Sequence, residues 1–325
     1  MPELARRADN ENRLKQVKPP AKTGSWARDF QKNKILYLLF LPVLVWLILF
    51  HYLPMPGLFM AFQNYSIKKG LFGSEFVGLK NFIDLFTGSG FPLAFRNTCA
   101  MALMSLTVGF LPGILFAIAL TTFPHKRIRR GFQLASYLPN FISAVVMCSL
   151  ATEFLSDRGA ITQLLCLLGA EKQNWLANPN IPVFWIIYTC IGIWQGIGWG
   201  SIVYVAAINN VSGDLHEAAA IDGATRFKRI LHITIPGILP LIIMLWTLNI
   251  GMVFKLVGNN ILLLEMPKTY EVADVLSTYT YRMSFEGASN YGLSTASGLF
   301  QSVLGTVLLV VSNKLGKKAS GYSLF

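Results

Sequence analysis

The sequence predicts an all-α membrane protein with six transmembrane helices. Hydrophobic residues make up 53% of the 325 residues and charged residues only 14%, a balance typical of multi-spanning membrane proteins. A helix needs about 20 consecutive apolar residues to cross the hydrocarbon core of a bilayer. Six segments meet this criterion, at 35–53, 97–122, 132–152, 182–208, 235–254 and 294–313.

The apolar segments divide the chain into four parts. Residues 1–33 are polar and basic, so we expect a cytoplasmic tail. Residues 34–94 comprise the first transmembrane helix and an external segment that is poor in charge and rich in aromatic residues. This helix is not a cleavable signal, because it follows a long polar tail, has no small-residue cleavage site and is long enough to span. Residues 95–315 form a core of five further transmembrane helices, and 316–325 form a second cytoplasmic tail.

Arg and Lys lie in alternate loops. Beyond the N-terminal tail they cluster at 126–130, 226–229 and 314–318, whereas the intervening loops are nearly balanced in charge. The positive-inside rule therefore places both termini and these clusters in the cytoplasm. This topology accounts for the net charge of +12 without nucleic-acid binding, and basic residues beside the membrane also favour contact with anionic lipid.

The loop at 209–235 carries acidic and basic residues and must face water. Asp214 followed by Glu217 predicts a capping box that opens a helix, and Gly223 is the expected end of that helix. Thr225 is expected to cap a second short helix that runs into the fifth span near Pro236. The sequence therefore predicts a helix–turn–helix projecting into the cytoplasm.

The spacing within this loop resembles the cytoplasmic loop of binding-protein-dependent ABC importers. In that family Glu-Ala-Ala is followed after three residues by Gly and after nine more by Ile-x-Leu-Pro. Glu217-Ala218-Ala219, Gly223 and Ile233-Thr234-Ile235-Pro236 match this pattern, with Ile235 where Leu is usual. The resemblance implies a type I ABC importer permease fold with a cytoplasmic coupling helix that docks onto an ATPase subunit. The coupling residues that it implies are Glu217, Ala218, Ala219, Ile221, Asp222, Gly223, Phe227 and Pro236.

A wider resemblance to sugar-importer permeases covers nearly all of residues 35–315. Asn64-Tyr65, the stretch from Gly78 to Phe82 and Phe95-Arg96-Asn97-Thr98 match the outer segment and second span of those proteins. The first span and Ala61-Phe62 are most similar to the subgroup that imports polysaccharide fragments, including alginate. The resemblance implies a location in the bacterial cytoplasmic membrane. It also implies four kinds of partner: a second homologous permease, an ATPase homodimer, a periplasmic or extracellular solute-binding protein, and an oligosaccharide.

We expect no catalytic site, metal site or cofactor in this chain. No phosphate-binding loop of the form G-x-x-x-x-G-K-[ST] occurs, so ATP and Mg²⁺ are expected on the ATPase partners. The four histidines lie at span ends or in cytoplasmic loops, and the four cysteines have no metal-ligand spacing.

The fourth and fifth spans contain polar and aromatic residues. Polar groups inside a membrane are costly unless they face a cavity or another helix. In related sugar importers these two helices build the sugar site, so the resemblance implies a substrate pathway lined by Gln195, Trp199, Asn249 and Lys255. Two interpretations of Gln195 and Asn249 stay open: they line the substrate pathway, or they only form hydrogen bonds between helices.

Lys255 and Glu153 at the outer span ends also have two interpretations. Lys255 either snorkels to the lipid headgroups or faces inward, where it would favour an anionic sugar such as a uronate. Glu153 is a candidate ion-pair partner of Lys255 or Arg158.

The function expected from these observations is import of oligosaccharides through a membrane-spanning subunit. Import of a neutral sugar or another small solute is the alternative within the same class. A stand-alone secondary transporter would be expected to have intramembrane carboxylates or inverted repeats, and neither is apparent. A membrane-embedded enzyme would need clusters of His, Asp or Glu within the spans.

Overall fold

The computed structural model describes residues 29–324, with gaps at 31, 257–259 and 287–288. Most of the predicted N-terminal tail, 1–28, lies outside the described residues. The chain divides into two compact units, Met1–Leu58 and Phe59–Phe325, and each is described by itself.

The first unit contains the first predicted transmembrane helix. Helix α3 (Lys34–Leu47) continues through a π-helical turn, η1 (Ile48–Tyr52), and the helical stretch ends at Phe62, in the second unit, with the 3₁₀ segment η2 (Met55–Phe62). Lys34 is its only Lys, Arg, Asp or Glu, so the stretch is apolar enough to span a membrane, as predicted.

The second unit is almost entirely helical. A two-stranded antiparallel sheet pairs β1 (Gln63–Asn64) with β2 (Glu75–Phe76). The remaining elements are α4 (Gly70–Gly73), α5 (Lys80–Thr87), α6 (Gly90–Met104), η3 (Ser105–Gly109), α7 (Leu111–Thr122), α8 (Lys126–Tyr137), η4 (Leu138–Phe141), α9 (Ala144–Phe154), α10 (Ala160–Leu167), η5 (Trp175–Ala177), α11 (Val183–Asn209), α12 (Gly213–Ile221), α13 (Arg226–Arg229), η6 (Ile230–Thr234), α14 (Ile235–Leu256), α15 (Ile261–Leu264), η7 (Pro267–Thr269), α16 (Tyr270–Ala273), α17 (Leu276–Phe285) and α18 (Tyr291–Ser320).

Within the described residues, five helical stretches are long and apolar enough to cross a membrane: Lys34–Phe62, Gly90–Thr122, Val183–Asn209, Arg226–Lys255 and Tyr291–Lys318. The third predicted span, 132–152, is not one continuous helix. Its two parts, Lys126–Phe141 and Ala144–Phe154, meet at 100°. The break follows from local sequence, because Pro139 lies in a 3₁₀ turn, Ile142 is extended, and Ser143 accepts a hydrogen bond from the Val146 amide and so starts a new helix.

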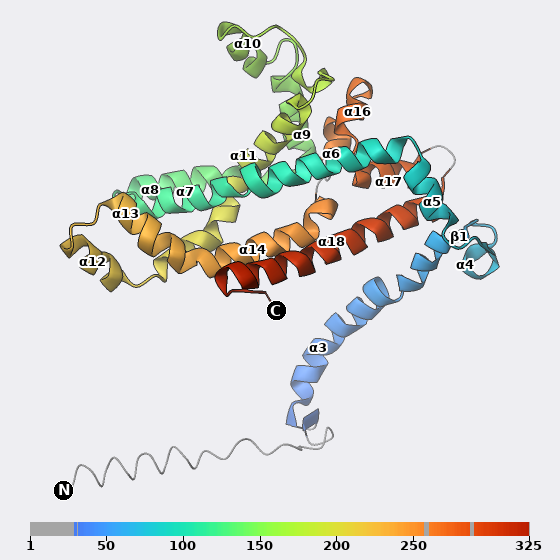
Figure 1. Ribbon diagram of the computed structural model, residues 1–325, viewed down its shortest axis with the longest axis horizontal. Coiled ribbons are helices and arrows are strands. Elements are labelled where there is room, and N and C mark those ends of the chain that lie inside the picture. Colours follow the sequence, from blue (N-terminus) through green and yellow to red (C-terminus); the bar gives the residue numbers. More distant parts are fainter. Residues whose placement is uncertain (1–28, 31, 257–259, 287–288, 325) are drawn as a thin grey trace. The chain divides into compact units, whose positions relative to one another are not determined.

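The long helices of the second unit pack as neighbouring pairs. Helix α7 lies beside α11, and α14 lies beside α18 (Figure 1). Glycines bring backbones together at two contacts. A Cβ on Gly305 would lie 2.7 Å from the Gly251 carbonyl oxygen, and a Cβ on Gly198 would lie 2.2 Å from the Ser136 carbonyl oxygen. Small residues are therefore required where α18 meets α14 and where α11 meets α8.

Two buried apolar clusters hold this unit together. The larger one includes Phe91, Met101 and Phe184, and it joins α6 and α11 to the segment 261–279. The smaller one includes Ile114, Tyr204 and Ile238, where α7, α11 and α14 meet near the loop at 209–235. The long helices therefore have one packed region near each end.

Candidate coupling loop and translocation cavity

The loop at 209–235 folds into the predicted pair of short helices, but its first helix begins differently. Helix α12 begins at Gly213, so Ser212 is the N-cap residue and Asp214 is the second helical residue. The predicted capping box of Asp214 and Glu217 is therefore wrong, and Glu217 is an exposed residue in the middle of the helix. Asp214 still stabilises the first turn, because its carboxylate lies close to the positive end of the helix dipole.

The end of α12 is a Schellman motif centred on Gly223. Gly223 has φ +78°, its amide donates to the Ala220 carbonyl at 3.1 Å, and the Ala224 amide donates to the Ala219 carbonyl at 2.8 Å. Two residues later Thr225 Oγ1 accepts from the Lys228 amide at 3.4 Å and caps α13. Both local predictions, the helix end at Gly223 and the cap at Thr225, are confirmed.

The predicted coupling residues lie mostly on the surface of this loop. Glu217, Ala218, Asp222, Gly223 and Pro236 are exposed, and Ala219 is partly buried. Two large apolar side chains stand out, because 87% of Ile221 and 72% of Phe227 are exposed. Apolar side chains this exposed on a water-facing hairpin are typical of a surface that contacts another protein.

The hairpin is connected to the fifth span by continuous helix. Helix α13, the π-helical turn η6 and α14 form one helical stretch from Arg226 to Lys255. Arg229 Nη1 also donates to the His216 carbonyl at 3.3 Å, which ties α13 back to α12. The hairpin and the fifth span are therefore mechanically connected.

A cavity of about 430 Å³ lies between α11, α14, η3 and α7, and Trp199 and Asn249 both line it. Its other polar or aromatic lining residues include Tyr188 and Tyr204, and none of the charged residues that the structure describes lines it. Asn249 Nδ2 donates to the Leu245 carbonyl at 2.8 Å, within its own helix. Aromatic faces and an amide are the groups that bind sugar rings and hydroxyls.

A stripe of glycines on α11 opens this cavity, and the sequence analysis did not identify it. Gly192, Gly196 and Gly200 recur every fourth residue, line the cavity, and have no atom within 4 Å of where a Cβ would lie. Gly198 lies on another face of α11, where it contacts the backbone of Ser136 in α8. The four-residue spacing was the available signal, although it alone does not distinguish a cavity from close packing.

Gln195 and Lys255 are not among the residues that line this cavity. Gln195 Nε2 donates to the Ile142 carbonyl at 3.4 Å, which is one of the groups exposed by the break between α8 and α9. Lys255 is exposed near the end of α14, two residues after the cavity-lining Val253. Within the described chain, neither Lys255 nor Arg158 lies within ion-pair distance, 4.0 Å, of Glu153.

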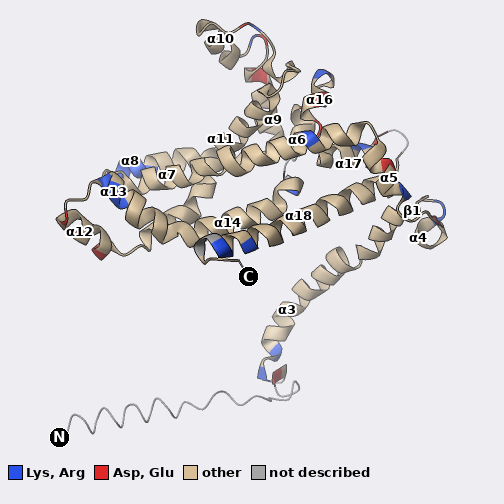
Figure 2. Ribbon diagram, viewed as in Figure 1, with Lys and Arg blue, Asp and Glu red and all other residues tan. Residues whose placement is uncertain are grey.

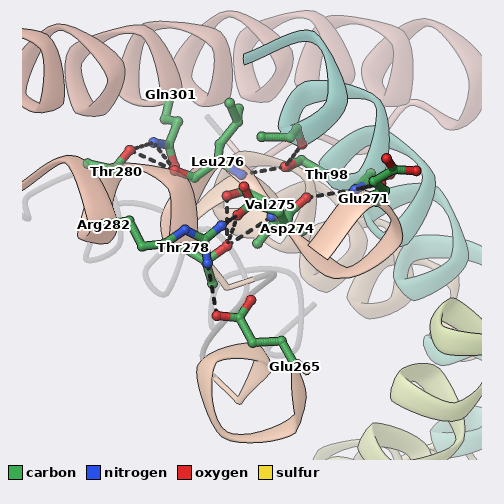
Figure 3. Close-up of polar contacts among 12 residues, drawn as sticks. Thr98, Glu265, Glu271, Asp274, Val275, Leu276, Thr278, Thr280, Arg282 and Gln301 are labelled. Atoms are coloured by element: carbon green, nitrogen blue, oxygen red, sulfur yellow. Dashed lines mark hydrogen bonds and ion pairs between the residues drawn. The ribbon is translucent and has the colours of Figure 1, made fainter. Parts of the chain in front are cut away.

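At the opposite end of the spans from the coupling loop, Arg282 forms an ion-pair cluster that the sequence analysis missed (Figure 3). Its guanidinium pairs with Glu265 at 2.9 Å and with Asp274, and it lies over the Tyr270 ring at 4.9 Å from the centroid. Burial raises the pKa of Glu265, although the Arg282 charge opposes that shift. The signal available in the sequence was that charged residues of both signs occur in 265–282.

The middle of α6 is hydrogen-bonded to the segment 271–276, which adjoins the Arg282 cluster. Asn97 Nδ2 donates to the carbonyls of Glu271 at 3.0 Å and Asp274 at 2.8 Å, and Thr98 Oγ1 accepts from the Leu276 amide at 2.8 Å (Figure 3). Asn97 and Thr98 are fully buried. These bonds hold α16 and α17 against the second span, at the end of the helices remote from the coupling loop.

Comparison with known proteins supplies the family. Residues 109–320 match the model described as "Binding-protein-dependent transport system inner membrane component". The chain is 38% identical over 288 residues to the polygalacturonan/rhamnogalacturonan transport system permease protein YteP of Bacillus subtilis (strain 168), covering 88% of this chain and 89% of that protein.

Two solved structures are similar over nearly the whole chain. One is a bacterial alginate ABC transporter in complex with an alginate pentasaccharide-bound periplasmic protein: TM-score 0.83, 35% identity, 92% of this chain and 99% of that chain. The other is a bacterial ABC transporter involved in the import of the acidic polysaccharide alginate: TM-score 0.82, 36% identity, 90% of this chain and 98% of that chain.

Proposed function

The chain belongs to the family of binding-protein-dependent transport system inner membrane components, and from that premise we propose that it is the permease subunit of an ATP-driven oligosaccharide importer. Family membership removes the stand-alone secondary transporter and the membrane-embedded enzyme as alternatives, because the subunit belongs to a multi-component ABC system and carries no catalytic role. ATP and Mg²⁺ bind to the partner ATPase subunits in this proposal.

The observation that carries the proposal is the continuous helical stretch from Arg226 to Lys255. One end bears the hairpin with exposed Ile221 and Phe227, and the other contributes Asn249 to the cavity. An ATPase dimer that grips the hairpin and closes on ATP would move the fifth span as a rigid body. The cavity would then open to alternate sides of the membrane.

An oligosaccharide is the substrate class that fits the cavity best. Its volume of about 430 Å³ lies in the range of small-molecule sites, roughly 300–1,000 Å³, and its aromatic residues and amide suit sugar rings and hydroxyls. The similar alginate transporters favour an acidic oligosaccharide. Since no charge lines the cavity, we assign any preference for acidic sugars to Lys255 at the external end of α14.

The proposed complex has three further components: a second homologous permease, two copies of an ATPase, and an external solute-binding protein. The family model and the binding-protein complex of the similar alginate transporter support this assignment. Both termini lie in the cytoplasm in this proposal, on the same side as the hairpin, because the Arg and Lys residues of α8 and α13 gather at the hairpin end of the helices (Figure 2).

Co-purification tests the coupling surface directly. Ile221→Asp combined with Phe227→Asp should abolish retention of the ATPase on the affinity-tagged chain, because a charge replaces each exposed apolar contact. The matched control is Leu168→Asp, since Leu168 is 84% exposed on the external side and should not affect retention. Equal retention in the double variant and the wild type would contradict the proposed function.

A further inference from the structure

A second cavity lies at the base of the coupling hairpin. It has a volume of about 380 Å³ and lies between the ends of α7 and α11 and the start of the helical stretch 226–234. Its polar lining includes Thr121, Thr122, Asn209, His216, Arg226 and Arg229. It is separate from the translocation cavity and shares no lining residue with it.

The charge of this cavity is entirely positive. Arg226 and Arg229 line it, and no Asp or Glu within the described part of the chain does. The acidic residues of the hairpin, Asp214, Glu217 and Asp222, are exposed on α12 and are not part of the lining. The basic helix α8, which begins four residues after Thr122, adds positive charge at the same end of the helices (Figure 2).

Arg229 has a donor without an acceptor. Its Nη1 donates to the His216 carbonyl, but its Nε is buried and has no hydrogen-bond partner among the described residues. An unpaired donor on a charged group carries a desolvation cost that an anion in the cavity would remove. A guanidinium presents its donors as a planar fork that matches the oxygens of a phosphate.

We propose that this cavity binds a phosphate group through Arg226 and Arg229. The cavity lies at the hairpin end of α7, α11 and the stretch that begins at Arg226, and basic pockets between transmembrane helices on the cytoplasmic side bind anionic headgroups. The ligand is in either case a phosphate group with one or two negative charges. It belongs to the headgroup of an anionic phospholipid or is free in solution. A bound phosphate would connect α13 to the ends of α7 and α11 and so stiffen the base of the hairpin.

Native mass spectrometry of the full chain, purified in detergent, tests the proposal with phosphatidylglycerol and phosphatidylcholine as probes. Phosphatidylglycerol should bind more tightly, and Arg226→Gln with Arg229→Gln should weaken its binding roughly tenfold or more, since charged hydrogen bonds are lost. The control variant, Lys317→Gln with Lys318→Gln, removes the same charge from the end of α18, outside the cavity. It should change phosphatidylglycerol binding by less than about threefold, because salt screens charges that lie away from the bound lipid.

Two further measurements complete the test. Displacement of the lipid by millimolar inorganic phosphate would identify free phosphate as the ligand, whereas no displacement would identify the lipid headgroup. Thr122→Asp keeps both arginines and changes an exposed rim residue, so it should weaken binding without affecting folding. Equal binding of the two lipids, or equal losses in the arginine and lysine variants, would overturn the proposal.

Discussion

Replacing Gly223 isolates the contribution of the turn in the coupling hairpin. Gly223 has φ +78° and no atom lies within 4 Å of where a Cβ would be, so substitution by Ala meets no steric obstacle in the structure. The cost is therefore conformational only, roughly 1–2 kcal/mol for a left-handed residue with a Cβ. A change of that size shifts the equilibrium between the native and a distorted turn by a factor of roughly 5–30.

We expect a graded series at this position. Gly223→Asn should retain most coupling because Asn tolerates the left-handed region, Gly223→Ala should reduce it several-fold, and Gly223→Pro should abolish it. The assay is ATP hydrolysis stimulated by the solute-binding protein, measured with sugar uptake in liposomes that contain the complete transporter. Membrane insertion should be normal in all three variants.

Gly213→Ala is the matched control, since Gly213 is exposed on the same helix, has open space at its Cβ position and lies outside the left-handed region. It should couple like the wild type. Wild-type coupling in Gly223→Pro would refute the assignment of the hairpin, and equal losses in Gly213→Ala and Gly223→Ala would refute the conformational argument.

Four other predictions follow from the described residues. A single cysteine at Lys172 should be labelled from outside intact cells and one at Lys228 should not, because the Arg and Lys excess predicts a cytoplasmic hairpin. Gly196→Leu should block uptake while leaving the protein folded, because the added side chain enters the translocation cavity. Lys255→Gln should impair uptake of a uronate oligosaccharide more than that of a neutral one of equal length, since only the acidic sugar loses a charge interaction. Burial raises the pKa of Glu265 above 4.5, so the folded chain binds this proton more tightly than the unfolded chain does. Thermal stability should therefore fall as the pH rises from 4.5 through the raised pKa, and Glu265→Gln should make this fall smaller.

Each of these predictions has an outcome that contradicts it. Labelling at Lys228 in intact cells would reverse the topology. Normal uptake with Gly196→Leu would move the pathway elsewhere, and Gly131→Leu, at an exposed glycine with open space outside the cavity, is its control. Equal effects of Lys255→Gln on both sugars would leave Lys255 as an anchor in the headgroups. An unchanged pH profile in Glu265→Gln would show that another group dominates stability in this range.

Local signals in the sequence predicted most of the elements correctly. Five of the six apolar segments correspond to helical stretches long enough to span a membrane, because hydrocarbon requires about 20 apolar residues whatever the tertiary context. Gly223 and Thr225 were identified correctly, since a left-handed turn and a helix cap depend on residues within one or two turns. The start of α12 was placed wrongly, because Ser212 and Asp214 are both good N-cap residues and the pattern alone does not choose between them.

The break in the third predicted span shows where hydropathy is insufficient. Both halves of 132–152 are apolar, so a hydropathy window treats them as one segment, although Pro139 and Ser143 mark the bend. The exposed carbonyl of Ile142 is then satisfied by Gln195, more than 50 residues away. Of the two interpretations that the sequence left open for Gln195, a lining residue of the substrate pathway or a hydrogen bond between helices, the contact with Ile142 supports the second.

Residue type and spacing by themselves determined the membrane class and the pair of short helices in the loop at 209–235, because these depend on hydrocarbon thickness and local backbone preferences. The motif in that loop resembled the family to which the chain belongs. Only the tertiary structure decided which glycines of α11 open a cavity and which contact another backbone, since Gly196 and Gly198 differ only in the face of the helix they occupy. It also decided the pairing of Arg282 with Glu265 and Asp274 and the position of Arg229 beside the ends of α7 and α11. Such contacts join distant segments, and no local preference encodes which segments meet.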